Sequence, residues 1–162
     1  MLLEQGSAYC IPDPKVSSDI TKVVSQQLQA ESLVSLFSKY RSNRILVVDD
    51  EEFCIASMRT MLERLGIDTM YQVDFCIDGE ESFQILKKAY EQGMSYKMVF
   101  TDFNMPNVNG IEATKKMRKH LLGRDRPKII GVTGHISEQF EREGREAGMD
   151  RVCAKPLYRR EL

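Results

Sequence analysis

Acidic, hydroxyl and basic residues follow four short apolar runs of this 162-residue chain. Asp49 and Asp50 stand where the run RILVVD ends, and Asp102 follows KMVFT. Thr133 ends the run KIIGVT, and Lys155 comes directly after RVCA. If these runs are parallel strands, their carboxyl ends share one edge of a sheet, which is where such sheets bind ligands. We therefore expect the five side chains to meet there.

Three carboxylates at one edge repel one another, so they either hold protons more tightly or bind a cation. An oxygen-rich set of this kind suits Mg²⁺, above all when a phosphate group also binds. Asp102 is the best candidate for a carboxylate nucleophile, because it closes the central strand and opens the loop DFNMPNVNG. The ammonium group of Lys155 can pair with a phosphoryl group, and the Thr133 hydroxyl can donate a hydrogen bond to it.

The elements that would position these residues alternate from residue 44 onward. Apolar runs predict strands over 44–49, 71–77, 97–101, 128–133 and 151–154. Apolar residues at helical spacing predict helices over about 52–65, 79–92, 111–122 and 137–147. This alternation indicates βαβ units and a doubly wound α/β fold with a five-stranded parallel sheet.

Composition excludes several classes of protein. Charged residues make up 29% and nearly balance at a net charge of −1, which argues against a nucleic-acid binder. No apolar run is long enough to span a membrane, and the first residues lack the pattern of a signal peptide. The four cysteines are irregularly spaced, so we expect reduced, mostly buried thiols. A cytoplasmic protein with no nucleic-acid or membrane partner is therefore expected.

Residues 1–43 are predicted to form an N-terminal arm ahead of the α/β domain, 44–162. Pro12 and Pro14 disfavour helix in its first part. Over about 17–40 the apolar side chains recur at mostly three- and four-residue spacings, which predicts an amphipathic helix.

Four blocks of the sequence resemble a response-regulator receiver domain: RILVVDD, TDFNMPNVNG, GVTGH and AKP. The resemblance covers roughly residues 44–157, and the strings NMPNVNGIEAT and EAGMDRVCAKP are most similar to receivers of hybrid histidine kinases. It implies a flavodoxin-like sheet with strand order 2-1-3-4-5. It also implies a phosphoacceptor module of a two-component phosphorelay, not an enzyme. The phosphoryl donor would be a phosphohistidine on a histidine kinase or a histidine phosphotransfer protein.

The resemblance assigns a role to each residue of a metal site. Asp102 would be the phosphoacceptor and Asp50 the direct ligand of Mg²⁺. Asp49 would assist, through water, and the backbone carbonyl of Asn104 would complete the protein ligands. The expected metal set is therefore Asp49, Asp50, Asp102 and Asn104.

Thr133 and Lys155 would bind the phosphoryl oxygens and transmit the change, and the Lys155–Pro156 peptide bond would be cis. The sequence departs from the family pattern three positions before the lysine. Receivers often place an aromatic switch residue there, and this chain has Val152. Aromatic coupling between Thr133 and the output face is therefore in question.

A second departure follows Pro156, where only Leu157 to Leu162 remain. Six residues cannot supply a fifth helix of about three turns. We expect either a domain truncated at its C-terminus, as in a fragment of a hybrid histidine kinase, or one in which the 17–40 helix replaces the missing helix.

Two other functions compete with phosphoacceptance. A pseudo-receiver would have the same fold and act only as a protein-interaction module; the intact acid pair, Asp102 and Lys155 argue against it. An aspartyl phosphatase would carry a general acid two residues after its nucleophile. That position is Asn104, which cannot serve as one.

Overall fold

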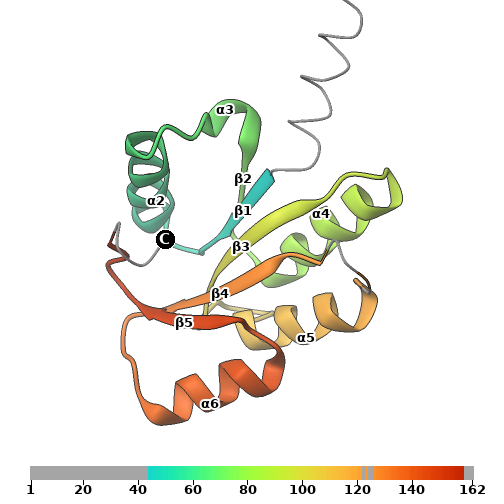
Figure 1. Cartoon of the computed structure of the whole chain (residues 1–162). Coiled ribbons are helices and arrows are strands. Elements are labelled where there is room, and N and C mark those ends of the chain that lie inside the picture. The colour runs from blue at the N-terminus through green and yellow to red at the C-terminus, as the bar shows by residue number, and fades with distance from the viewer. Residues whose placement is uncertain (1–43, 122, 124–125, 159–162) are drawn as a thin grey trace, which may run out of the picture. The chain divides into compact units, whose positions relative to one another are not determined.

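The computed structural model describes residues 44–121, 123 and 126–158. The predicted arm over 1–43, its helix over 17–40 and the last residues, 159–162, lie outside this part of the chain. Their interpretation, including replacement of a fifth helix, stays a prediction. The described residues form an α/β unit of five strands and five helices, arranged as in Figure 1.

Five parallel strands form one sheet in the order β2-β1-β3-β4-β5, which confirms the predicted fold class. Their bounds are β1 Arg44–Val48, β2 Val73–Cys76, β3 Tyr96–Asp102, β4 Lys128–Thr133 and β5 Arg151–Ala154. The strand order reverses between β1 and β3, and a ligand crevice forms where this happens. Val48 of β1 is paired with Thr101 of β3, so Asp49 and Asp102 follow at neighbouring positions of the sheet edge.

The helices are α2 Glu52–Arg64, α3 Thr69–Gln72, α4 Gly79–Glu91, α5 Gly110–His120 and α6 Glu138–Ala147. Asp78, Asn109 and Ser137 cap α4, α5 and α6, because each side chain accepts a backbone N–H of the first turn. Gly148 ends α6 in the left-handed conformation with φ 99°, as a glycine at that position should. No helix in the described part of the chain is long and apolar enough to cross a bilayer.

Helix α3 corrects the sequence analysis, which placed a strand over 71–77. Tyr71 and Gln72 belong to this helix, and β2 begins only at Val73. The reason is local: the Asp68 side chain accepts the Met70 N–H at 3.1 Å and so caps a single helical turn. The cap outweighs the strand preference of the aromatic and β-branched residues that follow it.

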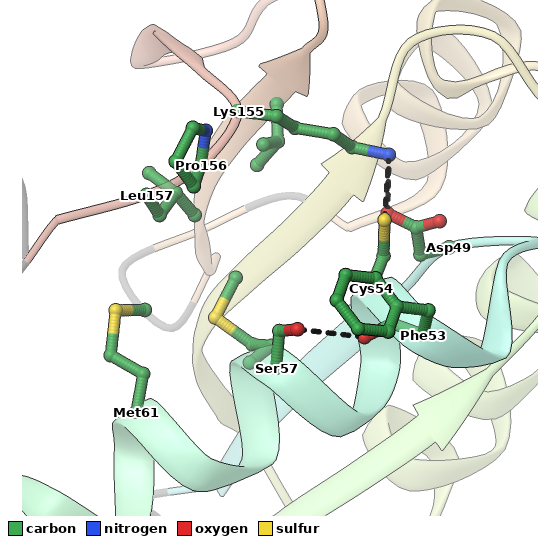
Figure 2. A pocket seen from close by; sticks show the side chains of 10 residues that line it. Asp49, Phe53, Cys54, Ser57, Met61, Lys155, Pro156 and Leu157 are labelled. Carbon is green, nitrogen blue, oxygen red and sulfur yellow. Dashed lines mark hydrogen bonds and ion pairs between the residues drawn. The ribbon is translucent and has the colours of Figure 1, made fainter.

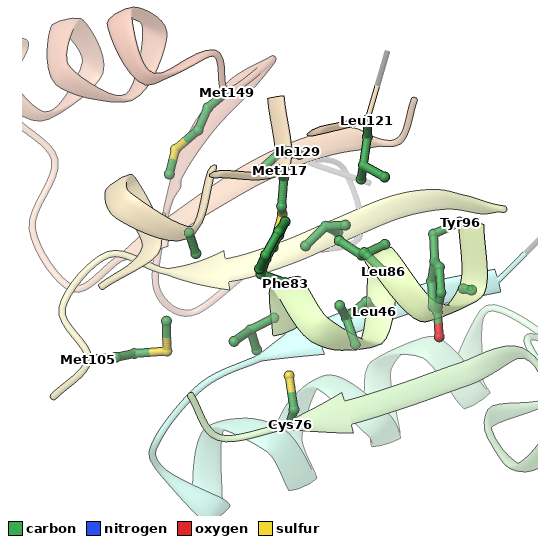
Figure 3. Packing of buried hydrophobic residues seen from close by; sticks show 14 of the residues in the cluster. Leu46, Cys76, Phe83, Leu86, Tyr96, Met105, Met117, Leu121, Ile129 and Met149 are labelled. Atoms are coloured by element: carbon green, nitrogen blue, oxygen red, sulfur yellow. The ribbon is translucent and has the colours of Figure 1, made fainter. Parts of the chain in front are cut away.

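Two apolar clusters hold the sheet from its two faces. Leu46 and Val48 belong to the cluster that includes side chains of α4 and α5 (Figure 3), whereas Val47 packs with Leu62 of α2 on the other face. This alternation follows from the two-residue period of a strand. Burial of each such side chain contributes roughly 1.5–3 kcal/mol. The central strands are therefore a rigid support for the residues at their carboxyl ends.

Candidate functional site

Three carboxylates meet at the carboxyl edge of the sheet, as the sequence predicts. Oxygen atoms of Asp49, Asp50 and Asp102 all lie within 4.8 Å of one another. Asp49 and Asp102 are each only 6% exposed, whereas Asp50 faces solvent. Two of the acids come from the end of β1 and the third from the end of β3, so the paired central strands bring them together.

Lys155 reaches this cluster from the other end of the domain sequence. Its Nζ lies 2.7 Å from Asp49 Oδ2 and 3.0 Å from Asp102 Oδ1, and Figure 2 shows the side chain extended toward Asp49. The backbone N–H of Lys155 donates to the Thr133 carbonyl at 2.7 Å, which continues the pairing of β4 with β5. The Lys155–Pro156 peptide bond is cis, as expected from the resemblance.

The charges of this cluster shift one another's protonation. Burial raises the pKa of Asp102; the hydrogen bond and positive charge of Lys155 oppose this, the charge of Asp49 adds to it, and the net direction is upward. Burial also works against the charge of Lys155. Its hydrogen bonds to Asp49 and Asp102 outweigh that effect, so the pKa of Lys155 is raised and its ammonium form is stabilised.

The loop after Asp102 is tied to that residue by short contacts. The Asn104 N–H donates to Asp102 Oδ2 at 3.1 Å. Helix α5 begins so close to the loop that a Cβ at Gly110 would overlap the Asp102 carbonyl oxygen. The glycine of the block NMPNVNG is therefore needed for close approach of two backbone segments.

Thr133 is placed at the same edge, but its hydroxyl is turned to a local partner. The side chain is 1% exposed, and Oγ1 donates to the His135 carbonyl at 3.0 Å. Its backbone carbonyl, not its hydroxyl, receives the N–H of Lys155. The predicted contact of the Thr133 hydroxyl with a phosphoryl group stays a prediction.

Cys54 is a member of the site that the sequence analysis missed. Its Sγ lies 3.5 Å from Lys155 Nζ and donates to Glu51 Oε2 at 3.1 Å. Burial, the Glu51 hydrogen bond and the charge of Asp49 raise the pKa of the thiol to about 11, so it is protonated at neutral pH. Its place in the first turn of a helix that starts at the sheet edge was the available signal.

Cys54 also lines a groove of about 300 Å³ between α2 and the residues after β5 (Figure 2). Apolar side chains of α2 and Leu157 form most of its wall, and Asp49 and Lys155 stand at one end. The groove thus opens directly onto the carboxylate cluster.

The chemistry of the cluster fits Mg²⁺. The three carboxylates supply hard oxygen donors at one point, and one of them, Asp50, is exposed enough to accept a hydrated ion. Lys155 brings one positive charge to three carboxylates, so the ionised cluster keeps a net negative charge that a divalent cation can balance.

A family model described as the response regulator receiver domain matches residues 45–162. This chain belongs to that family. Receiver domains are signalling modules of two-component systems, not classical enzymes, so the fold and the general role predicted from the sequence are confirmed.

Among curated proteins, this receiver domain is 36% identical over 112 residues to two-component response regulator 24 of Arabidopsis thaliana, covering 69% of this chain and 73% of that protein. It is 33% identical over 121 residues to the osmosensing histidine protein kinase SLN1 of Saccharomyces cerevisiae, covering 75% of this chain. The match spans 10% of SLN1 and 7% of hybrid signal transduction histidine kinase L of Dictyostelium discoideum.

A solved structure gives the same fold. The receiver domain of the histidine kinase CKI1 from Arabidopsis thaliana, complexed with Mg²⁺ and BeF₃⁻, superposes with a TM-score of 0.64 at 30% identity. The match covers 75% of this chain and 86% of that one.

Proposed function

We propose that this receiver domain accepts a phosphoryl group from phosphohistidine onto Asp102. In this proposal Asp49, Asp50, Asp102 and the backbone carbonyl of Asn104 hold Mg²⁺. The observation that carries the proposal is the position of Lys155 Nζ, which contacts Asp49 at 2.7 Å and Asp102 at 3.0 Å. A cation held this close to a nucleophilic carboxylate is placed to pair with the oxygens of an incoming phosphoryl group.

The transfer needs little covalent chemistry from the protein. A carboxylate oxygen of Asp102 attacks phosphorus, the P–N bond to the donor histidine breaks, and the imidazole leaves with the electron pair and takes up a proton. Lys155 neutralises charge on the phosphoryl oxygens, and Thr133 offers its hydroxyl once that hydroxyl turns away from His135. Bound Mg²⁺ would supply further charge neutralisation and hold the phosphoryl group in line.

Two relatives support the proposed phosphohistidine donor and the proposed Mg²⁺. SLN1 is named a histidine protein kinase, and the CKI1 receiver was crystallised with Mg²⁺ and BeF₃⁻. We accordingly propose a histidine kinase or a histidine phosphotransfer protein as partner. The proposed setting is the cytoplasm, which agrees with Cys54 and Cys76 being thiols outside any disulfide.

Acetyl phosphate with Mg²⁺ tests the proposal, read by intact-protein mass spectrometry. The wild-type chain should gain the mass of one phosphoryl group, and Asp102→Asn should gain none. Glu52→Gln is the matched control, because it removes a carboxylate from the same sheet edge without touching the cluster. Equal labelling of Asp102→Asn would place the phosphoryl group on another residue and overturn the assignment of Asp102. No labelling of the wild type by acetyl phosphate or by a phosphorylated phosphotransfer protein would favour a pseudo-receiver.

A further inference from the structure

Phe103 joins the proposed phosphoacceptor to helix α6. It directly follows Asp102 in the chain, yet its side chain is 3% exposed and belongs to the larger apolar cluster. Its ring meets the ring of Phe140 edge to face, with centroids 5.6 Å apart and planes inclined by 75°. Phe140 lies in the first turn of α6, and its N–H donates to Oγ of the capping residue Ser137 at 3.2 Å. The Phe103 side chain therefore connects the proposed phosphoacceptor with helix α6.

Two glycines provide the space that the Phe103 ring occupies. A Cβ at Gly131 of β4 would overlap the ring, and a Cβ at Gly144 of α6 would lie 3.1 Å from its Cζ. Any larger residue at position 131 would force the buried ring to move. The ring is thus enclosed between β4 and α6, and close-packed interiors of this kind transmit displacements.

The backbone of Phe103 is fixed as firmly as its ring. Its N–H donates to the Val132 carbonyl at 3.0 Å, and its own carbonyl receives the Gly110 N–H at 3.3 Å. Val132 precedes Thr133, the second residue proposed to contact the phosphoryl group. A displacement of Asp102 reaches Phe103 directly along the chain, and a displacement of Thr133 reaches it through the hydrogen bond to the neighbouring Val132 carbonyl.

We infer that Phe103, and not a side chain at position 152, couples the state of Asp102 to the position of α6. The inference rests on the proposed function, because it needs a ligand on Asp102. Val152 also lies against α6, since a Cβ at Gly144 would come within 2.7 Å of its Cγ2. Phe103, however, directly follows Asp102 in the chain, and its aromatic ring contacts the Phe140 ring of α6. Phe103 is a positioning residue in this account: it acts through packing and touches no substrate.

The test compares full-length variants with and without Mg²⁺ and BeF₃⁻, a stable mimic of the phosphoryl group. Binding of the mimic is measured by titration, and the response of α6 by hydrogen exchange of the amides over Glu138–Ala147. The variants are Phe103→Leu and Phe140→Leu, each of which removes one of the two rings that form the contact. Phe100→Leu is the matched control, because Phe100 is equally buried but belongs to the cluster on the other face of the sheet.

In the wild type, the mimic should change exchange in α6 roughly fivefold or more. Phe140→Leu should bind the mimic within about a factor of two of wild type yet lose most of the α6 response, because Phe140 lies outside the binding site. Phe103→Leu should lose the same response, and Phe100→Leu should keep it even though its stability falls.

The outcomes separate the inference from the proposed function. If the wild type does not bind the mimic, the proposed function fails and the inference fails with it. If the mimic binds but α6 exchange stays unchanged, or if Phe140→Leu keeps the full response, only the coupling through Phe103 is overturned.

Discussion

The ammonium group of Lys155 contacts two buried carboxylates at once. We expect Lys155→Met to slow phosphoryl uptake from acetyl phosphate at least about tenfold, because an electrostatic stabiliser of the transferred group is lost. Time courses by intact-protein mass spectrometry measure this rate. Lys116→Met, which removes a surface lysine paired with Glu80, should label at the wild-type rate. Wild-type labelling of Lys155→Met would remove the lysine from the mechanism.

Gly131 offers a second test at the scale of single residues. Gly131→Ala should lower the free energy of unfolding by about 1–3 kcal/mol, because the new Cβ overlaps the buried Phe103 ring. Adding Phe103→Leu should recover part of that loss, so the two changes should couple in a double-mutant cycle of urea melts. Strictly additive effects would mean that the glycine does not make room for the ring.

At the scale of elements, Asp150 ties the ends of α5, β4 and β5 together. Its carboxylate accepts hydrogen bonds from Arg118 at 2.7 Å, Lys128 at 2.9 Å and the Ile129 N–H at 2.8 Å. Arg118 also donates to the Gly148 carbonyl at 2.8 Å, just after α6. This network lies away from the carboxyl edge, so we expect it to act on stability alone.

The network predicts a specific dependence on pH. Burial opposes the charge of Asp150, but the hydrogen bonds of Ile129 and Lys128 and the charge of Arg118 outweigh it, so its pKa is lowered from 3.8. The ionised Asp150 carboxylate therefore contributes its full stabilisation of the fold above its unfolded-state pKa of about 3.8, and this stabilisation is lost as the pH falls through the lower folded-state pKa. Asp150→Asn should cost about 1 kcal/mol at pH 7, a modest value because the site is partly solvated.

Urea melts at pH 7 and near pH 3 measure this difference. The gap between wild type and Asp150→Asn should shrink at the lower pH, whereas Glu146→Gln, an exposed control on α6, should show a small effect at both. A gap that stays constant or widens toward low pH would contradict the assignment of the stabilisation to the ionised carboxylate.

The limits of sequence reasoning also appear at the scale of elements. The five strands were predictable because each is a short apolar run bounded by polar residues. Helix α3 was not, because one turn capped by Asp68 leaves no periodic pattern. Cys54 was missed for a related reason. Its contact with Lys155 joins residues 101 positions apart, and depends on how α2 is rotated against the sheet.

Some features of the candidate site were likewise predictable from the sequence, and others were not. Strand ends suggested that Asp49, Asp50, Asp102 and Lys155 would converge, because topology alone places them at one edge. The direction of the Thr133 hydroxyl could not be inferred, since it depends on a hydrogen bond within the loop after β4. The space for Phe103 was likewise hidden, because it requires two glycines on separate elements to face the same ring.

At the scale of the whole molecule, Mg²⁺ should stabilise the fold by relieving repulsion among the three carboxylates. At a concentration about ten times its Kd, a ligand adds about 1.4 kcal/mol, which raises Tm by several degrees in a domain of this size. Asp50→Asn should lose this response, and its Tm without Mg²⁺ should not fall, since one repelling charge is gone. Glu52→Gln should respond as wild type does. Equal responses in all three proteins by thermal melts would exclude the cluster as the ion's site.

Localising the acyl phosphate tests the central claim most directly. After reaction with acetyl phosphate and Mg²⁺, reduction with borohydride converts a phosphorylated aspartate to homoserine, which peptide mass spectrometry locates in the sequence. We predict homoserine at position 102 in the wild-type chain and at neither 49 nor 50. Homoserine at another aspartate, or its absence from a chain that has gained the phosphoryl mass, would contradict the account.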